Sequence, residues 1–133
     1  MSRDLFLSFE GRIGRQAFWL GLIALLVIEW IVFFLVLTLF GGSLTVAVDG
    51  GDSQAAMAAM YSLTGPAALV SLIFLWPALA IQIKRWHDRN KSGWWVLIAF
   101  LPIIGGLWVL IECGFLRGTV GPNAYGPDPV AAG

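Results

Sequence analysis

A run of 24 residues, Ala17–Phe40, contains a single charged side chain, Glu29. As an α-helix this run would extend about 36 Å, enough to cross a hydrocarbon core of about 30 Å with some tilt. Two further apolar runs occupy residues 67–83 and 94–116. Hydrophobic residues make up 59% of the chain and charged residues 12%, against about 25% charged residues in soluble domains. The sequence therefore predicts an integral membrane protein.

The three runs predict an all-α fold with three transmembrane helices in a single membrane domain, residues 1–133. Gly65-Pro66 offers a start for the second helix. Pro77 and Pro102 each remove a helix donor, which predicts kinks in the second and third helices. For the third run we expect a kinked full span and not a re-entrant hairpin, because three segments provide little protein to bury irregular backbone. Residues 117–133 predict a turn-rich tail.

The loop before the second run, residues 41–66, begins with glycines and continues with helix-forming residues. Asp52 or Ser53 is suited to cap a helix there. Such a helix would either lie on the outer membrane surface or extend the second span upward, and the sequence leaves both open.

Basic residues are concentrated on one side of the predicted spans. Of the eight Lys and Arg residues, seven precede the first span or lie between the second and third, and only Arg117 lies in the tail. Residues 41–66 contain none. The positive-inside rule therefore predicts a cytoplasmic amino terminus and a basic cytoplasmic helix-hairpin loop at residues 84–93. The same reasoning predicts that residues 41–66 and the carboxyl terminus are periplasmic.

The loop at residues 84–93 also contains the only histidine, His87, next to Asp88. An aspartate can orient an imidazole, so this pair suggests a lipid-modifying enzyme. However, adjacent residues on a helix do not face one another, and no nucleophile or metal-ligand pattern accompanies the pair. We therefore favour a structural role in which Asp88 pairs with Arg12, Arg15 or Arg85. We expect no catalytic residue, metal or cofactor.

Arg12 and Arg15 are spaced to share a helix face, and with the loop they form a basic surface at the inner interface. Guanidinium groups suit phosphate contacts. The leading interpretation is a non-enzymatic protein that binds lipid headgroups or a membrane partner through this face. The candidate residues are Arg12, Arg15, Arg85, His87, Asp88, Arg89 and Lys91.

Glu29 lies near the middle of the first span, where a charged carboxylate costs about 2.5–3.5 kcal/mol. Either it is a protonated carboxyl that donates a hydrogen bond to a neighbouring helix, or it is a proton or cation site. The second reading would make the protein a transporter or channel component. Glu112 is predicted nearer the outer end of the third span, so the two are not expected to form a carboxylate pair.

Four motifs occur in order along nearly the whole chain. They are Phe9-x-Gly11-Arg12-x-x-Arg15-x-x-Phe18-Trp19, then Arg85-x-His87-Asp88 with Ser92-Gly93-Trp94-Trp95, then Pro102-x-x-Gly105, and finally Gly118-Thr119-x-Gly121-x-Asn123-x-Tyr125-Gly126-Pro127-x-Pro129. This ordered set resembles the domain of unknown function 805 family. The resemblance implies a small protein of the bacterial inner (plasma) membrane with few transmembrane helices, and it implies no activity.

A bundle of three helices has little interior. We therefore expect membrane lipids as partners, together with a homo-oligomer or a larger membrane complex. The formal net charge of +0 gives no support to a nucleic-acid partner. A single cysteine, Cys113, excludes an intramolecular disulfide.

Overall fold

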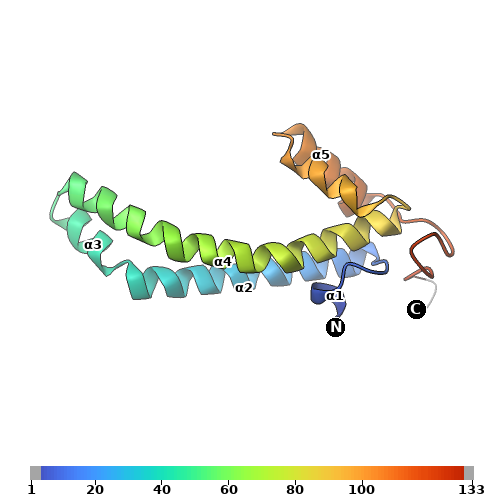
Figure 1. Ribbon diagram of the computed structural model, residues 1–133, viewed down its shortest axis with the longest axis horizontal. Coiled ribbons are helices and arrows are strands. Elements are labelled where there is room, and N and C mark those ends of the chain that lie inside the picture. The colour runs from blue at the N-terminus through green and yellow to red at the C-terminus, as the bar shows by residue number, and fades with distance from the viewer. Residues whose placement is uncertain (1–3, 131–133) are drawn as a thin grey trace. The chain divides into compact units, whose positions relative to one another are not determined.

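The computed structural model describes residues 4–130, and its two longest elements are apolar helices (Figure 1). They are α2 (Arg15–Phe40) and α4 (Ser53–Asp88), with mean hydropathies of 2.9 and 1.9 over their most apolar windows. Only 6% and 11% of these windows are buried, so most of their apolar side chains lie on the surface of the structure. By length and composition both helices are able to cross a membrane.

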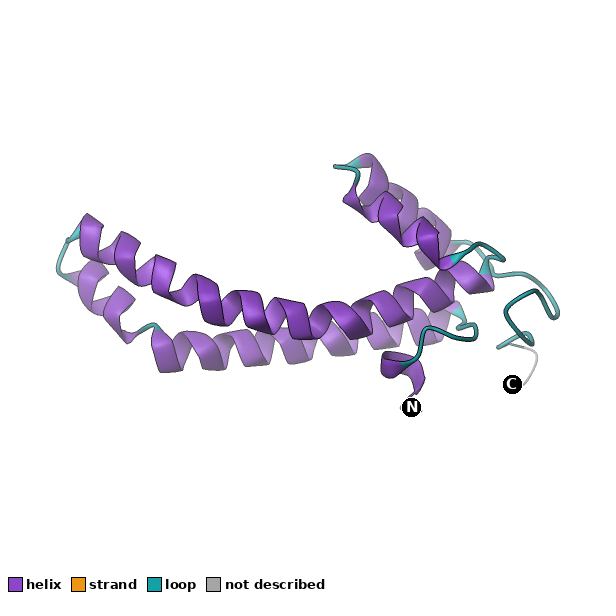
Figure 2. Cartoon of the chain, viewed as in Figure 1, coloured by secondary structure: helices purple, strands orange, loops and turns teal. Residues whose placement is uncertain are grey.

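Within residues 4–130 every other regular element is also helical, apart from a β-bridge between Asn123 and Gly126 (Figure 2). The prediction of an all-α fold is confirmed. The shorter elements are α1 (Asp4–Leu7), α3 (Gly42–Asp49), the 3₁₀ helix η1 (Gly93–Phe100), α5 (Ile104–Val109) and the π-helix η2 (Leu110–Phe115).

The chain divides into two compact units. The first unit combines Met1–Ala24 with Trp76–Gly133, and the second is the segment Leu25–Leu75. The second unit contains most of α2, all of α3 and the first part of α4.

Helix α4 begins at Ser53 because Asp52 caps it. The Asp52 Oδ1 atom accepts hydrogen bonds from the backbone nitrogens of Gln54 at 3.1 Å and Ala55 at 3.0 Å. The prediction that the second helix starts at Gly65-Pro66 is therefore wrong, and the alternative in which the helix extends upward from Asp52 is confirmed. Its 36 residues extend about 54 Å, more than a hydrocarbon core of about 30 Å. The helix continues without a break past Pro77, where a kink stays a prediction.

The third apolar run folds as a hairpin, and the prediction of a kinked span over residues 94–116 is wrong. Helix η1 leads into a turn that contains Pro102, and α5 and η2 return from it. At the turn Ile103 has φ 64°, and a Cβ on Gly105 would lie 1.8 Å from the Ile98 carbonyl oxygen. The chain turns here for two physical reasons. Pro102 has no N–H group to continue a helix, and Gly105 has no side chain to block close contact between backbone segments.

Contacts at the base of the hairpin confirm that both its ends lie together. Glu112 Oε1 accepts a hydrogen bond from Lys91 Nζ at 2.9 Å. A continuous helix between these residues would separate them by about 30 Å. Glu112 therefore lies beside the loop that follows α4, and its predicted position near the outer end of a third span is wrong.

The tail lies against the amino-terminal segment. Arg12 Nη2 donates to the Thr119 carbonyl at 2.6 Å, and Arg12 Nη1 donates to the Gly121 carbonyl at 2.7 Å. Segments joined by direct hydrogen bonds cannot lie on opposite sides of a hydrocarbon core about 30 Å thick. These hydrogen bonds conflict with the prediction that the membrane separates the amino-terminal segment from the tail, because the hairpin brings the two segments into direct contact.

Candidate functional site

Two arginines share one carboxylate inside the first unit. Arg12 Nε and Nη2 donate to Asp88 Oδ1 at 3.1 and 3.0 Å, and Arg85 Nη1 donates to Asp88 Oδ2. The side chains are almost completely buried, with exposed fractions of 1% for Arg12, 0% for Arg85 and 3% for Asp88. We call these three residues the ion-pair cluster. It confirms the predicted pairing of Asp88 with Arg12 and Arg85, whereas Arg15 lies elsewhere.

Further guanidinium donors of the ion-pair cluster bind main-chain carbonyls of the hairpin and tail. Arg12 donates to Thr119, Gly121 and Gly126, so all five of its N–H groups are used. Arg85 Nε donates to the Cys113 carbonyl at 2.6 Å, and its Nη2 donates to the carbonyl of Leu116. The cluster thus connects the amino-terminal segment, the end of α4, the returning half of the hairpin and the tail.

The hydrogen-bond and stacking partners of His87 are other than Asp88. Its Nδ1 lies 3.2 Å from the Gly11 carbonyl oxygen, which can only accept, so Nδ1 is the protonated nitrogen. Its ring stacks on Tyr125 with centroids 4.0 Å apart and an interplanar angle of 3°. Asn123 Nδ2 donates to the His87 carbonyl at 2.8 Å. The imidazole therefore joins the amino-terminal segment to the tail, in parallel with the ion-pair cluster.

The side-chain carboxylate of Asp128 holds together the backbone of the tail. Asp128 accepts hydrogen bonds from the backbone nitrogens of Val130 and Gly121, both at 2.9 Å. These two bonds lower the pKa of Asp128, which is partly exposed. Because the folded pKa is depressed, any stability from these bonds is present above the ordinary carboxyl pKa and is lost as the pH falls through the folded value.

Glu112 binds the two basic residues that follow α4. Its Oε2 accepts from Arg89 Nε and its Oε1 from Lys91 Nζ, both at 2.9 Å. Arg89 and Lys91 are partly exposed, at 25% and 26% of the side chain. The Lys91 ammonium also lies 4.6 Å from the ring centroid of Trp95, within range of a cation–π contact.

Arg15 reaches the end of the hairpin from α2. It is exposed, and within the described residues it donates one hydrogen bond, from Nη1 to the Phe115 carbonyl at 3.0 Å. One turn later Trp19 Nε1 donates to the Gly114 carbonyl at 3.1 Å. Arg117, two residues beyond Phe115, is exposed as well. Among the arginines of residues 4–130, Arg15 and Arg117 are therefore the two most exposed to the surroundings.

Lys84, which the sequence predicts as part of the basic inner surface, is buried. It is 3% exposed and donates to the Asp4 carbonyl of α1. Main-chain carbonyls carry no sequence signal, so neither this bond nor the carbonyl partners of Arg12 and Arg85 follow from residue types. Among residues 4–130 no group of three His, Cys, Asp or Glu side chains is placed to hold a metal.

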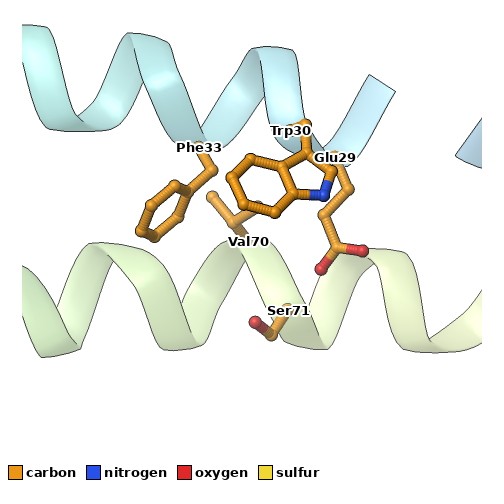
Figure 3. A pocket seen from close by; sticks show the side chains of 5 residues that line it. All are labelled: Glu29, Trp30, Phe33, Val70 and Ser71. Atoms are coloured by element: carbon orange, nitrogen blue, oxygen red, sulfur yellow. The ribbon is translucent and has the colours of Figure 1, made fainter. Parts of the chain in front are cut away.

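Glu29 belongs to the second unit. It lines a cavity of about 300 Å³ with Trp30, Phe33, Val70 and Ser71 (Figure 3). The other predicted site residues all lie in the first unit, so Glu29 forms a site of its own.

Comparison with known proteins shows that the chain is similar to uncharacterised proteins, including proteins of the bacterial inner membrane. The family model described as Protein of unknown function (DUF805) matches residues 6–127. The chain is 32% identical over 124 residues to Inner membrane protein YhaH of Escherichia coli (strain K12), covering 93% of this chain and 88% of that protein. It is 30% identical over an alignment of 152 positions to Uncharacterized protein YiiR of the same strain, which covers 91% of this chain and 85% of that protein.

A third relative, Inner membrane protein YhaI of Escherichia coli (strain K12), is 49% identical over 53 residues, which is 40% of this chain and 44% of that protein. No solved structure matches the chain.

Proposed function

The chain belongs to the DUF805 family of proteins of unknown function, and from this membership and the geometry of the first unit we propose that it is a non-enzymatic inner-membrane protein that binds anionic lipid headgroups. The observation that carries the proposal is the difference in side-chain exposure among its arginines. Arg12 and Arg85 are buried in the ion-pair cluster, whereas Arg15 and Arg117 are exposed beside the base of an apolar hairpin.

The proposed topology places the whole first unit's polar face in the cytoplasm. Helices α2 and α4 cross the membrane, and the hairpin enters the inner leaflet and returns. Helix η1 has 8 residues and extends about 16 Å at about 2 Å per residue, roughly half of a hydrocarbon core of about 30 Å. With the tail on this side Arg117 joins the other basic residues, so all 8 Lys and Arg residues obey the positive-inside rule.

The exposed side chains of the hairpin support its insertion into lipid. Trp94 is 78% exposed, Phe100 75% and Ile103 82%, and all three are apolar. Leaving such side chains in water would be unfavourable, and indole rings favour the headgroup level of a membrane. Irregular backbone at the turn needs cover by protein at membrane depth, which is why a homo-oligomer or a larger complex remains part of the proposal.

The partners of His87 and Asp88 favour a structural role over catalysis. Each side chain is already bound within the chain, His87 by Gly11 and Tyr125 and Asp88 by two arginines. A general base needs a proton to abstract from a substrate within hydrogen-bond reach, and the Asp88 oxygens face guanidinium groups instead.

The headgroup proposal predicts a selectivity for anionic lipid that depends on Arg15 and Arg117. Each juxtamembrane cation contributes about 1 kcal/mol near an anionic surface. Spin-labelled phosphatidylglycerol should therefore associate with the reconstituted protein at least about fivefold more strongly than spin-labelled phosphatidylcholine. Electron paramagnetic resonance measures the motionally restricted fraction of each lipid, and the double variant Arg15→Gln/Arg117→Gln should lose the preference.

The matched control is Gln16→Ala, a change at an exposed neutral neighbour of Arg15. It should keep the wild-type preference. Equal association of both lipids with the wild-type protein would contradict the headgroup proposal. A preference that survives the double arginine variant would also contradict it, and would direct attention to Arg89 and Lys91.

A further inference from the structure

The second unit contains acidic residues and no basic ones. Between Leu25 and Leu75 the sequence has no Lys, Arg or His, whereas it has Glu29, Asp49 and Asp52. Asp52 caps α4, and Asp49 is exposed at the end of α3. Glu29 differs from both, because it is half-buried within the most apolar helix of the chain. An ionised carboxylate at mid-membrane is costly unless a cation offsets it, and this unit supplies none of its own.

The cavity at Glu29 is built from both long helices. Glu29, Trp30 and Phe33 project from α2, and Val70 and Ser71 belong to α4. Figure 3 shows the Glu29 carboxylate extended from α2 toward α4, beside the indole of Trp30. The rings of Trp30 and Phe33 meet edge to face, with centroids 6.4 Å apart and an interplanar angle of 78°. The cavity volume of about 300 Å³ is sufficient for a small organic molecule.

The lining discriminates between kinds of cation. Ca²⁺ requires six to eight oxygen ligands, and the side chains of this cavity offer only the carboxylate of Glu29 and the hydroxyl of Ser71. An organic ammonium needs one counter-charge and is attracted to the faces of aromatic rings, with tryptophan the strongest. Trp30 is 70% exposed and Phe33 43%, so the cavity is open toward the surrounding lipid.

We propose that Glu29, Trp30 and Phe33 form a membrane-embedded binding site for a lipophilic organic cation, an ammonium group carried on an apolar body. The carboxylate supplies the counter-charge, the aromatic rings hold the cation, and the apolar body lies along Val70 and the lipid-facing side of the cavity. This site does not depend on headgroup binding at the first unit.

The test uses benzyltrimethylammonium as the probe and the full chain in lipid nanodiscs. Equilibrium dialysis of the radiolabelled probe, with the signal of empty nanodiscs subtracted, should show saturable binding. Glu29→Gln should weaken binding at least about tenfold, because it removes the counter-charge while keeping the side-chain shape. Trp30→Leu should weaken it about two- to fivefold through loss of the cation–π contact. The matched control Asp49→Asn removes an exposed carboxylate of the same unit and should bind as the wild type does.

Neopentylbenzene, the uncharged isostere of benzyltrimethylammonium, distinguishes recognition of the positive charge from nonspecific hydrophobic binding. As a competitor it should displace the labelled probe far less well than unlabelled benzyltrimethylammonium does. The proposal would be overturned if neopentylbenzene displaced the labelled probe at the same concentrations as unlabelled benzyltrimethylammonium. It would also be overturned if Glu29→Gln bound the probe as tightly as the wild type does. Circular dichroism establishes that each variant keeps its helices. If Glu29→Gln does not, Trp30→Leu decides, and binding by that variant at the wild-type level would overturn the site.

Discussion

Replacing Asp88 by asparagine should destabilise the protein by about 3–5 kcal/mol, because it leaves two buried guanidinium groups without their shared counter-ion. Arg12 and Arg85 are 1% and 0% exposed, so water cannot replace the carboxylate. The two positive charges would also repel each other in a poorly hydrated space. Equilibrium unfolding in mixed detergent micelles, followed by tryptophan fluorescence, measures the loss.

The ion-pair cluster also predicts strong coupling between its members. Arg12→Gln alone should be destabilising, but the double variant Arg12→Gln/Asp88→Asn should lose less than the sum of the two single changes, because it removes one charge of each sign. The matched control is Asp49→Asn, an exposed carboxylate in the other unit, which should change the free energy of unfolding by no more than about 0.5 kcal/mol. An equally small effect of Asp88→Asn would contradict a structural role for the cluster.

Gly118→Ala should release the tail from the first unit. A Cβ at this position would lie 1.8 Å from Asp88 Oδ2 and 2.6 Å from Oδ1, far inside van der Waals contact. The carboxylate cannot move aside without breaking its bonds to Arg12 and Arg85, so the tail must move instead. Forcing atoms into a filled space costs about 1–3 kcal/mol. Limited trypsin digestion measures this release. Arg117 is the last basic residue of the sequence, so cleavage of the bond after it removes the tail.

We expect cleavage after Arg117 to accelerate at least about fivefold in Gly118→Ala, the change in open population that corresponds to about 1 kcal/mol. Gly106→Ala is the control, since a Cβ there has nothing within 4 Å. It should be cleaved at the wild-type rate. Unchanged cleavage of Gly118→Ala would show that the tail does not depend on close contact with Asp88.

The sequence predicted the long helices better than the path of the chain after them. The apolar run Ala17–Phe40 differs from α2 by only two residues at its start. Residues 94–116 have the length and hydropathy of a span, and those properties are the same for a helix that crosses and a hairpin that returns. The deciding contacts are those of Gly105 with the Ile98 carbonyl and of Glu112 with Lys91, and tertiary contacts of this kind do not appear in hydropathy.

The sequence predicts the candidate site only in part, because here too the missing information lies in tertiary contacts. The isolated carboxylate of Asp88 among basic residues indicates an ion pair, with Arg12 and Arg85 among its predicted partners. Their further partners are backbone carbonyls, such as those of Thr119 and Cys113, which every residue type supplies. Residue types therefore could not show that the arginines are buried or that the tail packs against them. That packing supports the proposed topology, in which the carboxyl terminus lies on the cytoplasmic side.

The most direct test of this topology is the distance between Glu10 and Ala124, two exposed positions in the segments that the ion-pair cluster joins. Spin labels attached to cysteines at both positions report it by double electron–electron resonance in nanodiscs, and the native Cys113 is buried and inaccessible to the label. The structure predicts a distance well below the hydrocarbon thickness of about 30 Å. A distance of about 40 Å or more, as expected for labels on opposite membrane surfaces, would contradict it.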